Sequence, residues 1–395
     1  MQAFIDSLVP GAGGLSLQVS YLIGMVAFGA IVVFGFILPM AGVTSWLERR
    51  VWGKIQSRIG PNRVGPGGFL QWLADGLKNL LKEDVIPEAA DPVLFRIAPY
   101  IVVAGFVAAF VALPFAGNLI IADLNIGILY ISAVTSLVVV GILMAGWSSN
   151  NRWSMLGGIR SASQIVSYEI PAGLSIFPVV LLSGTLSMQG IVKAQGWSPV
   201  DWNMFHSPFT LAAFLLSYIA LLAEGNRTPF DLPEAESELV AGFATEYSGM
   251  RSLLFFLAEW GNLYVIGAIM ATLFMGGWQV PAFTENVVVV TVAQFVVFFL
   301  KAYLWVFVAM WIRATLPRVR VDQLMTLCWK YMVPIAMVNM FGTALVMVAL
   351  PHGSRLMRYA LVGLVVIFLV QFARRVRFHL RRSRGYDVPA EALTV

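Results

Sequence analysis

The feature that most limits the possible folds of this chain is its series of long, charge-poor apolar runs. A helix needs about 20 mostly apolar residues to cross the roughly 30 Å hydrocarbon layer of a bilayer. Such runs make the chain a polytopic membrane protein, and we predict an all-α fold. The nine candidate spans cover residues 19–43, 97–122, 124–151, 161–192, 208–223, 252–277, 286–312, 331–351 and 356–373.

The composition supports this class. Hydrophobic residues make up 59% of the chain and charged residues only 12%, well below the roughly 25% of a soluble domain. The spans and their short connections leave no room for a soluble module, so we predict one integral membrane domain over residues 1–395. Residues 1–18 contain no Lys or Arg and so lack the basic segment of a cleaved signal peptide. We expect the first span to stay in the protein.

The distribution of basic residues predicts the orientation. All Lys and Arg residues except Lys193, Lys301, Arg355 and Arg358 follow an odd-numbered run or lie in the C-terminal tail. Cytoplasmic loops carry an excess of Lys and Arg, so we predict an outside N-terminus and a cytoplasmic C-terminus. These residues are spread over several loops without interleaved aromatic residues, and we predict no nucleic-acid partner.

The ninth run is the weakest candidate, because only 15 residues separate Arg358 from Arg374. It spans the bilayer if the Arg358 side chain snorkels to the membrane surface. The alternative is a helix that lies in the interface.

The first cytoplasmic segment, residues 44–96, contains two local patterns. Residues 68–82 place apolar side chains on one helical face and polar ones on the other, which predicts an amphipathic helix on the bilayer surface. Residues 59–68 (IGPNRVGPGG) place Gly and Pro where they prevent regular structure, and no Gly-Lys-Ser/Thr follows, so a tight turn is predicted rather than a phosphate-binding loop. The apolar face of the helix comprises Phe69, Trp72, Leu73, Leu77 and Leu80.

Acidic residues concentrate between the fifth and sixth runs. Residues 223–260 hold seven of the 21 carboxylates, and a solvated loop would explain them if they did not extend into the flanking apolar runs. Carboxylates at membrane depth are costly and indicate function. If the middle of this segment is helical, Glu234, Glu238 and Glu246 share one face, whereas Pro229 and Pro233 prevent one continuous helix. The seven acids are Glu224, Asp231, Glu234, Glu236, Glu238, Glu246 and Glu259.

Three ionisable residues lie inside apolar runs, among them Glu259 of the acidic segment. Glu169 is either a structural partner of a basic residue on a neighbouring helix or a titrating group on a proton path. Lys301 and Glu259 would not stay charged alone in an apolar environment, so we expect each to pair or to share protons.

The cysteine and histidine residues that disulfides, iron–sulfur clusters, haem or metal sites require are few in this chain. Cys328 is the only cysteine, which excludes disulfides and any cysteine-ligated iron–sulfur cluster held by this chain alone. The three histidines, His206, His352 and His379, lie near the ends of runs or in the tail, so we predict neither haem nor a metal site.

Five stretches carry a family resemblance. They are 48–66 (ERRVWGKIQSRIGPNRVGP), 73–84 (LADGLKNLLKED), 146–171 (GWSSNNRWSMLGGIRSASQIVSYEIP), 223–260 and 311–325 (WIRATLPRVRVDQLM). Over roughly residues 19–350 the chain resembles the quinone-site membrane subunit of respiratory complex I (NADH-quinone oxidoreductase), called the H subunit in bacteria and subunit 1 in mitochondria. The GWSSNN form looks like the bacterial and chloroplast branches.

The resemblance implies an eight-helix core, a narrow quinone chamber beside the amphipathic helix, and an acidic path from the chamber into the membrane. The chain would act as an enzyme subunit that couples quinone reduction to proton translocation. Residues that match the chamber motifs are Glu48, Arg49, Arg58, Asp75 and Phe256. The acidic path would comprise Glu169, Glu224, Asp231, Glu234, Glu236, Glu238, Glu246 and Glu259, with Lys301, Arg160, Arg227 and Arg313 as charge partners.

The resemblance also implies the setting. Quinone would be the substrate, and FMN, NADH and the iron–sulfur clusters would bind partner subunits. The partners would be soluble iron–sulfur and quinone-chamber subunits on the cytoplasmic side, and small and antiporter-like subunits in a bacterial inner (plasma) membrane. Two features depart from the family pattern: the ninth run with its basic tail, and Val321 in place of a tyrosine.

Two other functions remain open from the sequence. A related membrane subunit of an energy-converting hydrogenase would share the scaffold without using quinone, although the complete 48–66 motif and Phe256 argue against it. A stand-alone ion transporter would be favoured by inverted repeats, and none is evident. The sequence does not specify the quinone, the electron donor or the resting protonation of the acids.

Overall fold

The structure is a computed structural model that describes residues 17–233, 236–281, 284–350 and 355–384. The described residues form helices and connecting loops and contain no strand. The long helices are α2 (Leu17–Val32), α3 (Leu38–Ile55), α5 (Pro92–Ala109), α6 (Gly127–Ser148), α7 (Arg152–Ser183), α9 (Pro208–Glu224), α11 (Gly249–Phe274), α12 (Val287–Thr315), α14 (Val333–Ala349) and α15 (Arg355–Arg384).

Shorter helical segments connect them. Four are α-helices: α4 (Gln71–Leu81), α8 (Met188–Ala194), α10 (Glu236–Leu239) and α13 (Val321–Thr326). Two are π-helices that join their neighbours without a break: η1 (Val33–Ile37) between α2 and α3, and η7 (Leu327–Met332) between α13 and α14. Five are 3₁₀ turns: η2 (Pro66–Gly68), η3 (Phe110–Ala112), η4 (Pro199–Asp201), η5 (Asn203–Phe205) and η6 (Gly242–Ala244).

Each of the nine predicted runs corresponds to a helix over most of its length. Within the part of the chain that the structure describes, eight stretches are long and apolar enough to cross a membrane, and α9, with 17 residues, is a shorter apolar helix. The ninth predicted span corresponds to Arg355–Val376, which meets the same criteria of length and composition. The chain is therefore an all-helical, polytopic membrane protein.

Several predicted boundaries were wrong. The fourth helix begins at Arg152 rather than residue 161, because the Asn151 side chain accepts a hydrogen bond from the Trp153 amide and caps it. It ends at Ser183 rather than residue 192, because the next residue, Gly184, has a φ of 64° in the left-handed region and caps the helix. The second run is helical only as far as Ala112, because Pro114 restricts the residue before it to an extended conformation.

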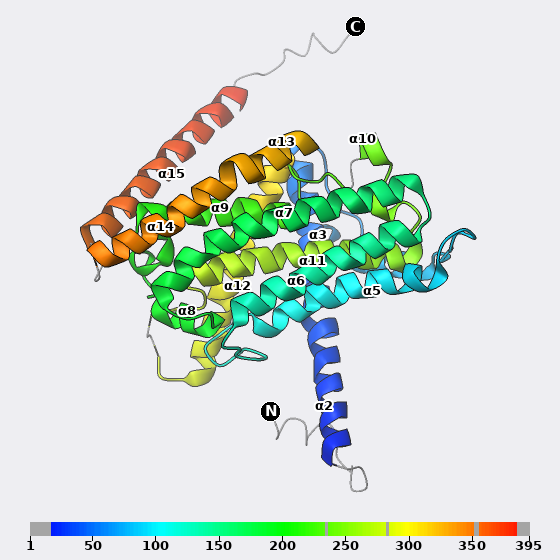
Figure 1. Ribbon diagram of the computed structural model, residues 1–395, viewed down its shortest axis with the longest axis horizontal. Coiled ribbons are helices and arrows are strands. Elements are labelled where there is room, and N and C mark those ends of the chain that lie inside the picture. Colours follow the sequence, from blue (N-terminus) through cyan, green and yellow to red (C-terminus); the bar gives the residue numbers. More distant parts are fainter. Residues whose placement is uncertain (1–16, 234–235, 282–283, 351–354, 385–395) are drawn as a thin grey trace.

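Helix α11 lies at the centre of the bundle. Figure 1 shows α5, α6, α7, α9, α11 and α14 running side by side, while α2 projects away from them and α15 crosses at an angle on one side. Every residue of α11 from Leu263 to Phe274 is buried. A Cβ atom on Gly267 would lie 2.4 Å from the Ala302 carbonyl oxygen, so a glycine is needed for the close approach of α12.

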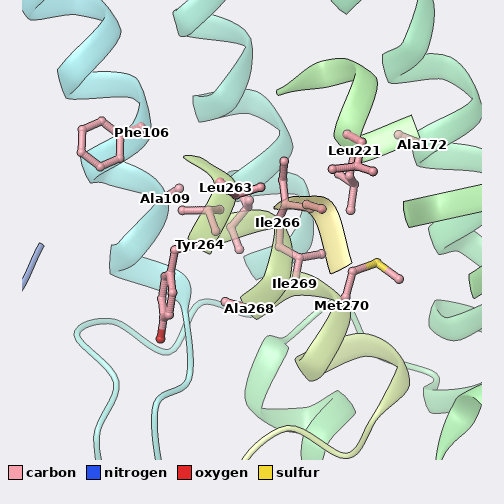
Figure 2. Packing of buried hydrophobic residues seen from close by; sticks show 14 of the residues in the cluster. Phe106, Ala109, Ala172, Leu221, Leu263, Tyr264, Ile266, Ala268, Ile269 and Met270 are labelled. Atoms are coloured by element: carbon pink, nitrogen blue, oxygen red, sulfur yellow. The ribbon is translucent and has the colours of Figure 1, made fainter. Parts of the chain in front are cut away.

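The core around α11 is apolar. Phe106 and Ala109 of α5, Leu221 of α9 and Ala172 of α7 surround the residues of α11 in Figure 2. The helices alternate in direction, and one end of the bundle is where α3, α6, α9 and α12 end and α5, α7 and α11 begin. We call it the Glu48 end, and the opposite end the far end.

Candidate functional site

Glu48 lies at the centre of a buried cluster of charges at the Glu48 end. The residue is only 4% exposed. Arg227 donates from Nη1 to Oε1 at 3.3 Å, Arg313 also donates to Oε1, and the Trp260 indole N–H donates to Oε2 at 2.8 Å. The Arg313 guanidinium also lies 4.7 Å from the centre of the Trp52 ring. A buried carboxylate is tolerated when its oxygens are paired in this way.

Arg227 connects Glu48 to a second carboxylate. The same Nη1 atom lies 3.0 Å from Oε1 of Glu259, one helical turn from the start of the buried part of α11. Arg227 is 3% exposed, and its Nε and Nη2 atoms have no hydrogen-bond partner among the described residues. Unpaired donors in a buried polar site indicate room for water or a polar ligand.

The loop that carries Arg227 is held by Gln164 of α7. The Gln164 side-chain nitrogen donates to the carbonyl oxygens of Ala223 and Phe230, each at 2.7 Å, and to Oδ1 of Asn226 at 3.1 Å. It therefore bonds to both sides of Arg227 in the chain. Gln164 is fully buried, so no water replaces these bonds without a structural change.

Asp231 adds a third carboxylate beside the cluster. Its Oδ2 atom lies 3.1 Å from Nη2 of Arg318. Burial raises the pKa of Asp231 above its usual value, and the charges of Arg318, Arg313 and Arg227 oppose that rise. Three carboxylates and three guanidinium groups thus share one region, and their charge states depend on one another.

The amphipathic helix α4 packs against the same part of α3. Arg49 and Asp75 form an ion pair at 2.6 Å, and a Cβ atom on Gly42 would lie 2.4 Å from the Trp72 ring. The predicted helix is confirmed, and its exposed apolar side chains include Leu73 and Leu77. This arrangement suits a helix that covers lipid on one face and holds Asp75 against the bundle on the other.

Phe256 lies close to the cluster, whereas Arg58 does not contact it. The half-exposed Phe256 ring stacks on Trp260, with ring centroids 5.9 Å apart. Trp260 in turn bonds to Glu48. Arg58 is exposed in the loop after α3, and its Nε atom donates to Gln56 at 2.6 Å.

The acids continue from the cluster into the bundle through two cavities. A small one of about 40 Å³ is lined by Glu259, Glu224, Asn226 and Asn262. A larger one of about 270 Å³, mostly apolar, is lined by Glu224, Asn262 and Glu169. Glu224 and Asn262 line both cavities, so the order from the Glu48 end is Glu48, Arg227, Glu259, Glu224 and Glu169.

Two predicted acids lie apart from this row. Glu238, with a side chain 54% exposed, pairs with Arg160 at 2.5 Å, and Glu246 accepts a hydrogen bond from Asn151. The predicted helical face is wrong for these two residues: α10 ends at Leu239, and Val240 has a φ of 66°, which a β-branched residue rarely adopts and which does not continue a helix. Glu234 and the side chain of Glu236 lie outside the described residues.

The expected pairing of Lys301 is also wrong. Its ammonium group donates to the carbonyl oxygens of Met275 and Gly277, at 2.7 and 2.9 Å, and lies 5.0 Å from the centre of the Trp202 ring. No carboxylate of the described residues forms an ion pair with it. Lys301 therefore caps the C-terminal end of α11, where the helix leaves carbonyls unpaired, at the far end of the bundle.

Several contributing residues were not predicted from the sequence. They are Trp260 and Trp52, which contact Glu48 and Arg313, together with Gln164, Arg318 and Asn262. The only available signal was that Trp52, Gln164, Trp260 and Arg318 lie in the motif stretches 48–66, 146–171, 223–260 and 311–325, whereas Asn262 lies in none of them. Within the described ranges, no group of three or more His, Cys, Asp or Glu side chains could hold a metal ion.

Comparison with known proteins places the chain in a family. The sequence model of the family described as NADH dehydrogenase matches residues 28–344. A protein from Anaeromyxobacter dehalogenans, named as the H subunit of NADH-quinone oxidoreductase, is 54% identical over 349 residues, which cover 84% of each chain. The chain belongs to the family of NADH-quinone oxidoreductase H subunits.

Two further relatives of this family extend the comparison. The H subunit of the Dehalococcoides mccartyi strain CBDB1 enzyme is 48% identical and covers 80% of this chain and 84% of its own. Subunit 8 of the Rhodothermus marinus NADH-quinone oxidoreductase is 44% identical and covers 82% of this chain and 97% of its own. The chain is thus a multi-pass bacterial membrane protein and a membrane subunit of a multi-subunit oxidoreductase, complex I, which translocates protons.

Proposed function

We propose that this chain forms the membrane wall of the quinone chamber in complex I and couples quinone reduction to proton movement. The observation that carries the proposal is the continuous row from Glu48 through Arg227, Glu259 and Glu224 to Glu169. One end of this row lies beside the paired helices α3 and α4. The other end lies in an apolar cavity inside the bundle.

The chamber would lie beside the Glu48 end, between α4 and the start of α11. The Arg49–Asp75 pair fixes α4 on α3, and Phe256 presents a half-exposed aromatic ring next to Trp260. An aromatic ring beside a few polar groups is the usual lining for a flat, mostly apolar ligand. In this scheme Arg58 and the exposed face of α4 meet the soluble subunits or the lipid at the chamber entrance.

Coupling would work through the charges of the Glu48 cluster. Electrons from an iron–sulfur cluster on a partner subunit reduce the quinone, and the reduced quinone takes up protons from nearby donors. Loss of a proton near Glu48 changes the field on Glu259 and Asp231, because coupled groups titrate together. Protons then shift through Glu224 toward Glu169.

The surroundings follow from the same scheme. The Glu48 end would face the cytoplasm, with the N-terminus outside and the C-terminus inside, since that end carries most of the basic residues. Soluble subunits would cover Glu238, Glu246 and their partners Arg160 and Asn151. Small and antiporter-like membrane subunits would receive protons from the region of Glu169, which lines a cavity that also contains the exposed α6 and α7 residues Leu129 and Phe177.

Substitution of Glu169 tests the proposal. In the assembled enzyme, Glu169→Gln keeps the shape of the side chain and removes its proton site, so we expect fewer protons pumped per electron. The number of protons pumped and the rate of electron transfer are both measured in inside-out vesicles with NADH as donor. Glu285→Gln, an exposed acid at the far end, is the matched control and should pump normally. A normal proton-to-electron ratio in Glu169→Gln would remove that residue from the path.

The chamber is tested separately. A photoreactive quinone analogue bound to the intact complex should label peptides that contain Phe256 or Glu48, and excess quinone should prevent the labelling. Labelling confined to other subunits would contradict a chamber wall formed by this chain.

A further inference from the structure

A second polar cavity lies at the far end, away from the Glu48 cluster. Its volume is about 320 Å³, and it is bounded by the end of α7, the end of α8, the turns η4 and η5, and Arg358 from the first turn of α15. The lining includes Asp201, Trp202, His206 and Arg358. Nothing in the proposed quinone chemistry uses these residues.

Three polar atoms of the residues that line the cavity have no partner in the described part of the chain. The Nε of Arg358, the indole nitrogen of Trp202 and Nδ1 of His206 are all buried and form no hydrogen bond with the described residues. The first two are donors only. Buried unsatisfied groups in a cavity of this size call for a ligand or water.

Both residues of the ion pair in the cavity can still form further hydrogen bonds. Nη1 of Arg358 lies 3.7 Å from Oδ1 of Asp201, longer than the roughly 2.7–2.9 Å of a charge-assisted hydrogen bond. The Asp201 side chain fits beside Gly196 because a glycine has no Cβ atom. A Cβ atom on residue 196 would lie 2.8 Å from the Asp201 carboxylate. The site therefore presents a cation and an anion side by side, each able to accept a further partner of opposite charge.

We place the cavity at the level where a bilayer meets water. It is formed by the ends of membrane helices, and Trp197, in the loop just before η4, is 58% exposed; tryptophan is enriched at this level. Leu356 and Tyr359, next to Arg358 on α15, are exposed. The residues in the apolar stretch of α15 are not buried by the rest of the described chain. Acyl chains can lie along this surface while a headgroup enters the cavity.

We propose that the cavity binds the headgroup of an aminophospholipid of the phosphatidylethanolamine type, in the leaflet at the far end. The phosphate oxygens accept hydrogen bonds from Arg358 and from the Trp202 indole, since guanidinium and indole groups only donate. The ammonium group, two carbons away in the same headgroup, donates to the Asp201 carboxylate. Burial and the charge of Arg358 lower the pKa of His206 below its usual value, so its neutral ring accepts or donates without adding a second cation.

The same chemistry distinguishes other lipids. Phosphatidylcholine carries a trimethylammonium group that has no N–H to donate to Asp201. Phosphatidylglycerol has no cation at all, so its binding would leave the carboxylate beside a phosphate. The bound lipid would also hold the first turn of α15 against η4 and η5, the segments that α15 contacts there.

The test uses the intact complex in nanodiscs and a phosphatidylethanolamine analogue with a photoreactive acyl chain. Cross-linked peptides are mapped by mass spectrometry, and unlabelled phosphatidylethanolamine, phosphatidylcholine, phosphatidylglycerol and soluble phosphoethanolamine compete. We expect labelling of α15 or of residues 182–206, with phosphatidylethanolamine competing roughly tenfold better than the other three. Equal competition by phosphatidylcholine or phosphatidylglycerol would overturn the headgroup assignment, and full competition by soluble phosphoethanolamine would overturn a lipid source.

Two variants and one control complete the test. Arg358→Gln and Asp201→Asn should each reduce labelling roughly tenfold. Arg355→Gln removes a charge from the same turn of α15 without touching the cavity and should label like wild type. Unchanged labelling in both cavity variants means that water alone fills the cavity, and the proposal fails. The competition series on the wild-type complex decides the question even if a variant does not assemble.

Discussion

Gln164 offers the most direct test of how the acidic row is held together. The substitution Gln164→Leu keeps the volume of the side chain and removes its three hydrogen bonds to residues 223–230. Two buried carbonyl groups, those of Ala223 and Phe230, each lose a 2.7 Å hydrogen bond, although the Ala223 carbonyl keeps the Asn226 amide as a donor. At about 1.5 kcal/mol each, the loop loses about 3 kcal/mol.

This loss acts on Arg227, because the loop carries it between Glu48 and Glu259. A shift of about 3 kcal/mol changes the balance between the held and displaced positions of the loop on the order of 100-fold. We therefore expect Gln164→Leu to lower both the quinone reductase rate and the number of protons pumped per electron, although no proton-carrying group has been removed. Both are measured in inside-out vesicles.

Gln195 provides a matched control. It is also buried, and its side-chain nitrogen donates to the carbonyls of Ile191, Thr272 and Leu273 at the far end. Gln195→Leu removes these bonds, together with the two that the Gln195 oxygen accepts from the Asn203 and Gly276 amides, without touching the acidic row. Any general loss of stability should therefore affect both variants. Equal proton-to-electron ratios in Gln164→Leu and Gln195→Leu would refute the reasoning.

A third variant adds a readout that a purely structural role would not change. The carboxyl group of Gln164→Glu can donate one hydrogen bond when protonated, whereas its anion repels the carbonyl oxygens. The activity of this variant, relative to wild type, should therefore rise toward acidic pH. A flat ratio across the pH range would contradict the positioning role.

Three further predictions follow from the contacts. Trp260→Phe keeps the aromatic ring and removes the hydrogen bond to Glu48, which should lower the quinone reductase rate roughly tenfold; an unchanged rate would show that this bond is dispensable. Arg227→Met removes the counter-charge of two buried carboxylates, at a cost of about 3–5 kcal/mol, and we expect little assembled complex on native gels; adding Glu259→Gln should restore part of the yield, and no recovery would argue against their pairing. The pKa of His206 is lowered in the folded protein, so below pH 6.5 the folded protein binds fewer protons at this residue than the unfolded chain does. The stability that His206 contributes above that pH is therefore lost as pH falls. The free energy of unfolding decreases by at most about 1.4 kcal/mol per pH unit. His206→Gln should reduce the acid-dependent fall in melting temperature of the complex, and an identical fall would exclude the residue as its source.

The spans were predictable because each depends on a local run of apolar residues. The errors at Arg152 and Ala112 came from local features that a count of charges does not include: a capping asparagine and a proline. Long-range partners were not predictable in the same way. Glu48 lies on α3 and Arg227 on the loop after α9, 179 residues apart in the chain, and only the folded bundle brings them together.

Lys301 shows a different limit. A lysine in an apolar run needs a partner, and the sequence suggests a carboxylate because carboxylates are visible in it. Backbone carbonyls at the end of a helix are equally good acceptors, yet they cannot be recognised until the helix end is located. The same holds for Gln164, whose importance comes entirely from the main chain that it contacts.

Arg227 offers one nitrogen atom to two carboxylates, and this sharing has a consequence for how fast the row can respond. When either carboxylate becomes neutral, the guanidinium is free to favour the other through a small torsional adjustment of a single side chain, without displacement of any helix. Side-chain reorientations of this kind take nanoseconds or less in the open and remain far quicker than millisecond domain movements. The helices can then act as a fixed frame, and a switch of a few ångströms at most suffices to pass on an electrical signal.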